Sequence, residues 1–262
     1  MRKKSNKKMR TALILCGGRG TRLGLITKKI PKSLVKIKGK PIIWYILKIL
    51  KKNNFNHFIL PTGYKGNSLK KYLRKNIFKN FNLSIVDTGI NTSIAKRISS
   101  VKKFIKSDDF LLLNGDAIFN FELDKIFKNH IKDKNTHITF LGSEVILPYG
   151  TIVISKSVVK NFQRNVVFNA VKIKDKNNSI AHVYSRMAIL KKKLLNQNFS
   201  KYKNFEEDLY PRIIKNYKCK FQKLSGFWHS IDNIKDINVL NEDVEKRKKI
   251  NTLFRDLNNL ET

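Results

Sequence analysis

A glycine-rich loop that directly follows an apolar run constrains this chain more than any other segment. The apolar run covers residues 12–16. Three glycines with hydrogen-bond donors among them come next: Gly17, Gly18, Arg19, Gly20, Thr21 and Arg22. Because glycine has no side chain, backbone N–H groups in such a loop can approach a bulky anion closely, and the bases supply matching charge. With Lys32 ten residues further on, the segment predicts a loop that binds a polyphosphate.

This loop matches neither of two common phosphate-binding motifs. It lacks the spaced triple glycine of dinucleotide-binding folds and the Gly-Lys-Ser/Thr ending of a P-loop, so the mechanisms of those motifs do not transfer. An alternative interpretation is a glycine-rich turn between a strand and a helix, with a few solvated bases. We favour the polyphosphate loop, because open α/β sheets bind their ligands at the carboxyl ends of buried strands.

Strand-like and helix-like patterns alternate through the first half of the chain. We expect strands at residues 12–16, 57–60, 83–86 and 110–113, and helices at residues 41–50, 65–76 and 93–105. Such alternation is typical of a mainly parallel sheet covered by helices on both faces. The sequence therefore predicts an α/β fold, a Rossmann-like three-layer sandwich around a mainly parallel mixed sheet. Residues 10–140 would form its nucleotide-binding half.

The rhythm changes after residue 136. Strand-like pieces with few helices between them follow at residues 137–141, 151–155, 166–173 and 180–184, which indicates an antiparallel extension or a small β-rich substrate lobe. We then expect a helix at 206–218, a strand at 221–224 and one closing helix at 233–259. The predicted organisation is a basic disordered tail at 1–9, a catalytic domain at 10–235 with its acceptor half at 141–235, and a C-terminal helix at 236–262.

The chain is strongly basic, with 55 Lys and Arg against 19 Asp and Glu and a formal net charge of +36. Such a charge requires that a polyanionic partner be considered. The sequence contains no zinc-ligand spacing, no RNP-like strand and no basic region leading into heptads. We therefore expect only nonspecific contact with nucleic acid, and keep a nucleic-acid-binding protein as a further hypothesis.

Three observations bear on the compartment. Two cysteines cannot form a disulfide framework, which favours a reducing environment. The basic N-terminus precedes an apolar run too short for a secretory signal, and the chain has no apolar segment of about twenty residues. We expect a cytoplasmic protein without a membrane span. A homo-oligomer is compatible with the sequence.

Two aspartates follow apolar segments that lie far apart in the chain. Asp116 comes after the run 110–113 and a glycine, and Asp232 follows the segment 226–231. Both carboxylates would point into the same mouth of the sheet. Two carboxylates with phosphate oxygens and waters make an ordinary Mg²⁺ shell, since that ion rarely has an all-protein cage. A turn or a helix cap is the alternative for an isolated Gly-Asp pair.

Further segments accompany the loop at Pro31-Lys32, Gly39 to Trp44, Gly63 to Gly66, Val86 to Gly89, Gly115-Asp116 and Gly226-Phe227-Trp228 with Asp232. Together they resemble the sugar-1-phosphate nucleotidyltransferase family, and within it most closely the glucose-1-phosphate cytidylyltransferases. The resemblance implies the nucleotide-diphospho-sugar transferase type of fold. It also implies Mg²⁺-dependent transfer of CMP from CTP to a sugar 1-phosphate or related phosphorylated acceptor. Pyrophosphate would leave, and the product would be a precursor of a surface glycan.

The resemblance also assigns roles to residues of this chain. It implies nucleotide binding by Leu15, Gly17, Gly18, Gly20, Thr21, Arg22, Lys32, Thr88, Arg97 and Asp116. It implies catalytic roles for Arg22, Lys32 and Asp116, and a metal site at Asp116 and Asp232. It implies acceptor binding by Tyr149, Gly150, Arg164 and Glu206. An exposed helix surface is the alternative for Arg97, and a helix cap is the alternative for Glu206.

The chain departs from the cytidylyltransferase pattern at three places. Ile94-Ala95-Lys96-Arg97 stands where the family has Thr-Gly-Gly-Arg, and Gln163-Arg164-Asn165 where it has Glu-Lys-Pro. Tyr184-Ser185-Arg186 stands where it has Asn-Gly-Gly. The triphosphate half therefore matches the family better than the acceptor half does. Transfer of uridylyl, thymidylyl or guanylyl groups is the alternative within the class, and an inactive nucleotide-binding regulator is the alternative outside it.

Overall fold

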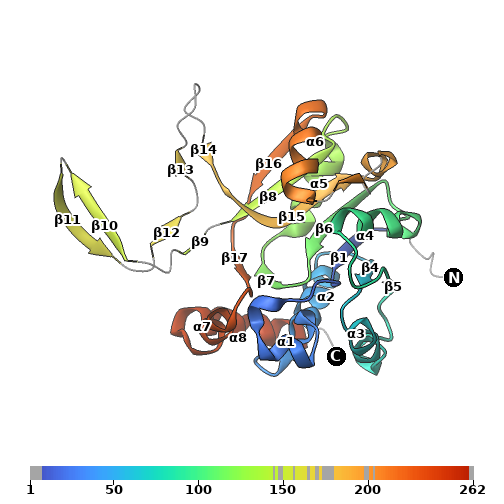
Figure 1. Ribbon diagram of the computed structural model, residues 1–262, viewed down its shortest axis with the longest axis horizontal. Helices are drawn as coiled ribbons and strands as arrows, with labels where there is room; N and C mark the ends of the chain where they lie inside the picture. The colour runs from blue at the N-terminus through green and yellow to red at the C-terminus, as the bar shows by residue number, and fades with distance from the viewer. Residues whose placement is uncertain are drawn as a thin grey trace.

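The computed structural model describes residues 8–143, 145–146, 150–155, 157–163, 166–168, 171–172, 180–197, 201–202 and 204–259. A central sheet with helices on both sides makes up the body of the molecule, as Figure 1 shows. A hairpin of β10 (Thr151–Ser155) and β11 (Val158–Gln163) extends away from this body at the left of the same view.

The described residues form a central sheet of seven strands in the order β16-β8-β15-β6-β1-β4-β5. Its strands are β1 (Thr11–Leu15), β4 (His57–Thr62), β5 (Leu83–Asp87), β6 (Asp109–Asn114), β8 (Ile138–Ser143), β15 (Val183–Lys191) and β16 (Cys219–Lys223). Only β15 among them runs antiparallel to its neighbours β6 and β8, whereas the other neighbouring pairs are parallel. The predicted mainly parallel mixed sheet is confirmed.

Helices cover both faces of this sheet, as the two clusters of buried side chains show. Their bounds are α1 (Leu25–Lys29), α2 (Ile42–Lys52), α3 (Gly66–Leu73), α4 (Ile94–Val101), α5 (Leu123–Lys132), α6 (Tyr210–Asn216), α7 (Ile234–Glu242) and α8 (Val244–Asn258). In β1, Ala12 and Ile14 pack with α2, α3, α5, α7 and α8, while Leu13 packs with α4 and α6 on the opposite face. This alternation follows from the period of two along a strand.

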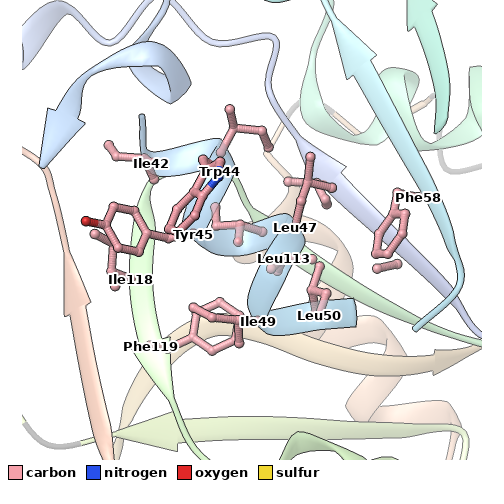
Figure 2. Close-up of a cluster of buried hydrophobic side chains, with 14 of the residues drawn as sticks. Ile42, Trp44, Tyr45, Leu47, Ile49, Leu50, Phe58, Leu113, Ile118 and Phe119 are labelled. Atoms are coloured by element: carbon pink, nitrogen blue, oxygen red, sulfur yellow. The ribbon is translucent and has the colours of Figure 1, made fainter. Parts of the chain in front are cut away.

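Helix α2 is the most deeply buried of these helices. All its residues from Ile42 to Leu50 are buried, because apolar side chains surround it almost completely. Figure 2 shows Ile118 and Phe119 of β7 (Ala117–Asn120) on one side of the helix and Phe58 of β4 on the other. The helix therefore fixes β7 against the central sheet.

The second half of the chain is rich in short antiparallel pairs, as predicted. Besides the β10–β11 hairpin, β9 (Val145–Ile146) pairs with β12 (Val167–Phe168), and β13 (Val171–Lys172) pairs with β14 (Ile180–Ala181). Near the body, β17 (Phe227–Ser230) pairs with β7, and β2 (Lys36–Ile37) pairs with β3 (Lys40–Pro41). The predicted boundary at residue 140 falls inside β8, so both halves contribute strands to one sheet.

Two sequence predictions are wrong in detail. The single closing helix at 233–259 is two helices, because Asp243 adopts an extended backbone and its side chain accepts a hydrogen bond from Lys246 N, which starts α8. The strand expected at 180–184 is broken, and β15 continues to Lys191. Of the predicted tail, residues 1–7 lie outside the described part. No helix in the described part combines the length and apolar character that a membrane span needs.

Candidate active site

Several loops meet at the carboxyl edge of the central sheet. Strands β1, β4, β5 and β6 run in the same direction, so the segments after Leu15, Thr62, Asp87 and Asn114 lie at one edge. Since β15 runs the opposite way, its first residues reach this edge too, with Val183 opposite Ser143 at the end of β8. Open α/β sheets bind ligands at this edge.

The glycine-rich loop leaves β1 and turns sharply into a short 3₁₀ helix, Thr21–Leu23. Gly20 has a φ of 63°, in the left-handed region that favours glycine. The hydroxyl of Thr27 donates to the carbonyl of Gly20 at 3.0 Å, which holds the turn. Gly18 is exposed, and no atom lies within 4 Å of the position a Cβ would take there. The loop therefore presents bare backbone to solvent.

The buried side chain of Arg97 supports this loop from the interior of the protein. The residue is buried, and its Nη1 donates to the carbonyl of Thr62 at 2.8 Å and to the hydroxyl of Thr88 at 2.6 Å, while Nη2 donates to Ile90 O at 3.1 Å. A Cβ on Gly17 would overlap the guanidinium. Burial lowers the pKa of Arg97, and the carboxylate of Asp87 partly offsets this.

The alternative that Arg97 lies on an exposed helix surface is therefore wrong. Its guanidinium shapes the loop from inside the protein, and Thr88 belongs to the same arrangement because its own hydroxyl donates to Thr62 O at 2.6 Å. Direct contact of either residue with a nucleotide stays a prediction. Leu15 has a similar supporting position, with its carbonyl accepting from Gly115 N at 3.0 Å.

The structure brings Lys32, Asp116 and Asp232 together beside the loop. Lys32 Nζ donates to Asp116 Oδ2 at 2.8 Å and to Asp232 Oδ1 at 3.1 Å. The pairing of β17 with β7 explains this meeting, since Ser230 lies opposite Ala117 and Ile231 N donates to Asp116 O at 2.8 Å. Both carboxylates therefore leave the same end of one antiparallel ribbon.

Two predicted residues of the loop face solvent near this cluster. Arg22 is 74% exposed, and its Nη1 lies 3.9 Å from Asp232 Oδ1. Thr21 is also exposed. Their side chains are therefore free to turn toward a ligand bound over Gly18.

Sequence reasoning missed two members of this cluster. Arg186 Nη1 donates to Asp232 Oδ1 at 3.1 Å, and Ser230 Oγ donates to Asp232 Oδ2 at 3.0 Å. Burial alone would raise the pKa of Asp232, but the hydrogen bond from Arg186 and the charge and hydrogen bond of Lys32 lower it to about 2. The departure from Asn-Gly-Gly at residues 184–186 was the signal that pointed to Arg186.

Asp116 and Asp232 are the residues of this cluster that could hold a divalent cation. The carboxylates converge on one nitrogen, and Asp116 Oδ1 is buried without a hydrogen-bond partner among the described residues. Oxygen donors of this kind suit a hard cation that completes its shell with phosphate and water. No group of three or more His, Cys, Asp and Glu that could hold a metal ion occurs in the described part.

The predicted acceptor residues are only partly visible. Tyr149 and Arg164 lie outside the described residues, and a Cβ on Gly150 would overlap the ring of Phe162 in the hairpin. Glu206 is the second residue of the π-helical turn Phe205–Leu209 that leads into α6, and its N–H donates to Oδ1 of the capping Asn204 at 3.1 Å. The acceptor roles of all four residues stay predictions.

The carboxylate of Glu206 acts on the edge where β15 begins. Burial is the main cause that raises the pKa of Tyr184, and the charge of Glu206 adds to it. Burial works against the charged form of Arg186, but Asp232, Asp116 and Glu206 raise the pKa of that guanidinium. Glu206, Tyr184 and Arg186 therefore belong to one electrostatic neighbourhood next to the carboxylate cluster.

Comparison with known proteins identifies the family of this chain. The model of a family described as nucleotidyl transferase matches residues 11–247. The chain belongs to this family. It is 29% identical over 253 residues to a probable glucose-1-phosphate cytidylyltransferase of Bacillus subtilis (strain 168), covering 88% of this chain and 94% of the relative.

Two further relatives extend the comparison. The chain is 37% identical over 122 residues to the D-glycero-alpha-D-manno-heptose 1-phosphate guanylyltransferase of Campylobacter jejuni, covering 46% of this chain and 54% of the relative. A crystal structure of HddC from Yersinia pseudotuberculosis complexed with GMP-PN superposes with a TM-score of 0.65 at 21% identity, covering 92% of this chain and all of the other. The superposition with this crystal structure confirms the predicted fold.

Proposed function

We propose that this protein transfers a nucleoside monophosphate from a nucleoside triphosphate to a sugar 1-phosphate, with CTP as the preferred donor. One observation supports this most: Lys32 Nζ contacts both Asp116 and Asp232 beside a loop of bare backbone. An oxygen of the acceptor phosphate attacks the α-phosphorus, a new P–O bond forms, and the bond from the α-phosphorus to the bridging oxygen breaks. Pyrophosphate leaves with the electrons of that bond.

The residues of the loop would bind and orient the triphosphate. The exposed backbone at Gly18 approaches the phosphates, and Thr21 and Arg22 turn toward the leaving pyrophosphate. Lys32 balances the charge that develops around the α-phosphoryl group. Such in-line transfers leave the protein little covalent work, so position and charge account for most of the rate.

We propose that Asp116 and Asp232 hold a Mg²⁺ ion. The buried, unpartnered Oδ1 of Asp116 supports this, because an ion would satisfy an oxygen that no protein donor reaches. When bound, the ion neutralises phosphate charge and orients the oxygens of the α-phosphoryl group. The rest of the shell would come from phosphate oxygens and water.

The preference for CTP rests on the Bacillus relative, which is named a probable glucose-1-phosphate cytidylyltransferase and matches almost end to end. A second candidate is GTP, because the Campylobacter relative is named a guanylyltransferase and is more identical over a shorter segment. We also propose that the reaction runs in the cytoplasm and supplies a nucleotide sugar for a surface glycan. Glucose 1-phosphate is the first acceptor to test.

A matrix of assays tests this proposal. Pyrophosphate release is measured for CTP, GTP, UTP and dTTP, each with a panel of sugar 1-phosphates that includes glucose 1-phosphate and a heptose 1-phosphate. We expect turnover with CTP and one sugar 1-phosphate, and little turnover after Asp116→Asn. Turnover only with GTP would show that the enzyme transfers a guanylyl group and not a cytidylyl group.

Thermal unfolding separates an inactive regulator from an enzyme with an untested acceptor. A ligand that binds the folded state raises the melting temperature. A shift with CTP but no pyrophosphate from any acceptor, equal in the wild type and Asp116→Asn, would favour the regulator. No shift with any of the four triphosphates would refute the proposed function.

A further inference from the structure

The guanidinium of Arg186 contacts both carboxylates of the cluster, Asp116 and Asp232. Its Nη1 is 3.1 Å from Asp232 Oδ1, 3.3 Å from Asp232 Oδ2 and 3.6 Å from Asp116 Oδ2. One nitrogen thus approaches three carboxylate oxygens from two residues. A divalent cation shared by Asp116 and Asp232 would compete with this nitrogen for the oxygens of Asp232 and for the space beside Asp116.

We propose that Arg186 takes the place of the divalent cation in the free protein, and that a cation displaces it onto the phosphate of the acceptor. The inference rests on the proposed function, since it assumes that Asp116 and Asp232 bind a metal. It adds an exchange that the proposed function does not contain. Metal binding and acceptor binding become coupled through one guanidinium.

The backbone places Arg186 in this position. Its φ is 59°, in the left-handed region that residues other than glycine, asparagine and aspartate rarely adopt. The residue lies in the irregular part of β15, where the pairing with β8 shifts register between Tyr184 and Met187. A bulge of this kind redirects a side chain. The strand therefore aims the guanidinium at the cluster.

The charges in the cluster support displacement. Two carboxylates contact the partly buried cations Lys32 and Arg186, and the exposed Arg22 lies 3.9 Å from Asp232, so the pair carries no surplus negative charge for a further cation. A Mg²⁺ ion gains full attraction to the carboxylates only if one cation leaves. Arg186 is a better candidate than Lys32, because it is 31% exposed whereas Lys32 is 17% exposed, and it contacts both carboxylates whereas Arg22 contacts Asp232 alone. Lys32 also remains necessary beside the α-phosphoryl group.

The surroundings of Arg186 fit a phosphorylated acceptor. A displaced guanidinium stays charged, and its planar donors bind a phosphate in a bidentate way. The hydroxyl of Tyr184, two residues before Arg186, lies 2.7 Å from the hydroxyl of the buried Tyr210, and the exposed Glu206 supplies a carboxylate for hydroxyl groups. Positive charge for a phosphate thus lies next to hydrogen-bond partners for a sugar.

Manganese binding tests the exchange without any turnover. Free Mn²⁺ is measured by electron paramagnetic resonance during titration of nucleotide-free protein. Arg186→Gly keeps the left-handed backbone and removes the charge, so we expect Mn²⁺ to bind about tenfold more tightly than in the wild type. Arg186→Lys is the matched control, with a Kd close to that of the wild type. Equal Kd values for the wild type and Arg186→Gly would overturn the inference.

Inorganic phosphate tests the second half of the exchange. Because phosphate would draw Arg186 away from the carboxylates, we expect it to tighten Mn²⁺ binding by the wild type and not by Arg186→Gly. The variant corrects for direct contact between phosphate and manganese in solution. No effect of phosphate on the wild type would overturn the role of Arg186 toward the acceptor.

These outcomes separate this inference from the proposed function. If neither the wild type nor Arg186→Gly binds Mn²⁺, both the metal site and the exchange are wrong. If Mn²⁺ binds equally well to the wild type and Arg186→Gly while pyrophosphate is still released from a triphosphate, only the exchange is wrong. If turnover occurs, Arg186→Gly raises the KM for the sugar 1-phosphate by about tenfold or more and changes the KM for the triphosphate little.

Discussion

The two sides of the candidate site are built in different ways. The loop side consists of backbone that leaves β1, supported from below by the buried Arg97 and held by a hydrogen bond from Thr27. The acceptor side, named for the function proposed for it, consists of long polar side chains at the start of β15, with Arg186 and Tyr184 among them. Under the proposed function, chemistry that depends on phosphates alone would fall to fixed backbone, and recognition of a particular acceptor would fall to side chains that substitution can change.

We expect the largest effect on activity from loss of Lys32, because its amine contacts Asp116 and Asp232 between the two sides. We expect Lys32→Ala to lower kcat by about a hundredfold to a thousandfold, since a preorganised positive group near the transferred phosphoryl is lost. Lys29→Ala, at the exposed end of α1, is the matched control. Pyrophosphate release measures both. A loss of only a few fold would show that the junction is not in the reaction path.

The ionisation of Asp232 makes the stability of the folded protein depend on pH, which tests the ion pairs between the two sides. Its pKa of about 2 in the folded state is lower than in the unfolded chain, so its ionisation stabilises the fold above pH 4 and the gain disappears as the pH falls toward 2. The gain at pH 7 is about 2 kcal/mol at most. We expect Asp232→Asn to melt at a lower temperature at pH 7, with the difference from the wild type shrinking between pH 4 and pH 2. A difference that grew on acidification would contradict this pairing.

Two glycines on the loop side provide a matched test of its backbone. Gly17→Ala would overlap the guanidinium of Arg97, so we expect it to destabilise the protein by about 1 to 3 kcal/mol. Gly18→Ala meets open space and would keep the stability of the wild type, while its methyl group weakens triphosphate binding. Denaturant unfolding and the KM for the triphosphate measure these effects. Equal stabilities of the two variants would mean that Arg97 moves freely.

The acceptor side predicts a smaller and more local effect. Tyr184→Phe leaves the buried hydroxyl of Tyr210 without its partner at 2.7 Å, which costs about 1 to 2 kcal/mol of stability. We expect the KM for the sugar 1-phosphate to rise modestly and the KM for the triphosphate to stay constant. A larger effect on the triphosphate would break the division into two sides.

The sequence was most informative where local patterns and the fold agree. The alternation of strands and helices predicted the sheet, and the position of Asp116 and Asp232 after apolar segments predicted a meeting that Lys32 now marks across 200 residues of chain. Ligand-binding residues of open α/β sheets gather at the carboxyl ends of the strands, so this meeting could be predicted whatever the separation of the two aspartates along the chain.

The sequence was less informative where a long-range contact decides the structure. The antiparallel course of β15 could not be predicted, since the shift near Arg186 interrupts its alternation and its neighbours β6 and β8 lie elsewhere in the chain. Asp243 fits a helical pattern as well as a cap, so one long helix was predicted. An exposed helix surface was an alternative for Arg97, because charged side chains are rarely buried unless partners outside their own helix bind them.

The antiparallel ribbon of β7 and β17 also sets the stage of chain synthesis at which both aspartates of the site are present. Asp116 is synthesised in the first half of the chain, whereas Asp232 arrives only with the strand that pairs back onto β7. A nascent chain lacks half of its acidic pair until β17 has emerged. Under the proposed function, an unfinished copy that already contains the glycine-rich loop would therefore lack one of the two carboxylates that hold the metal ion.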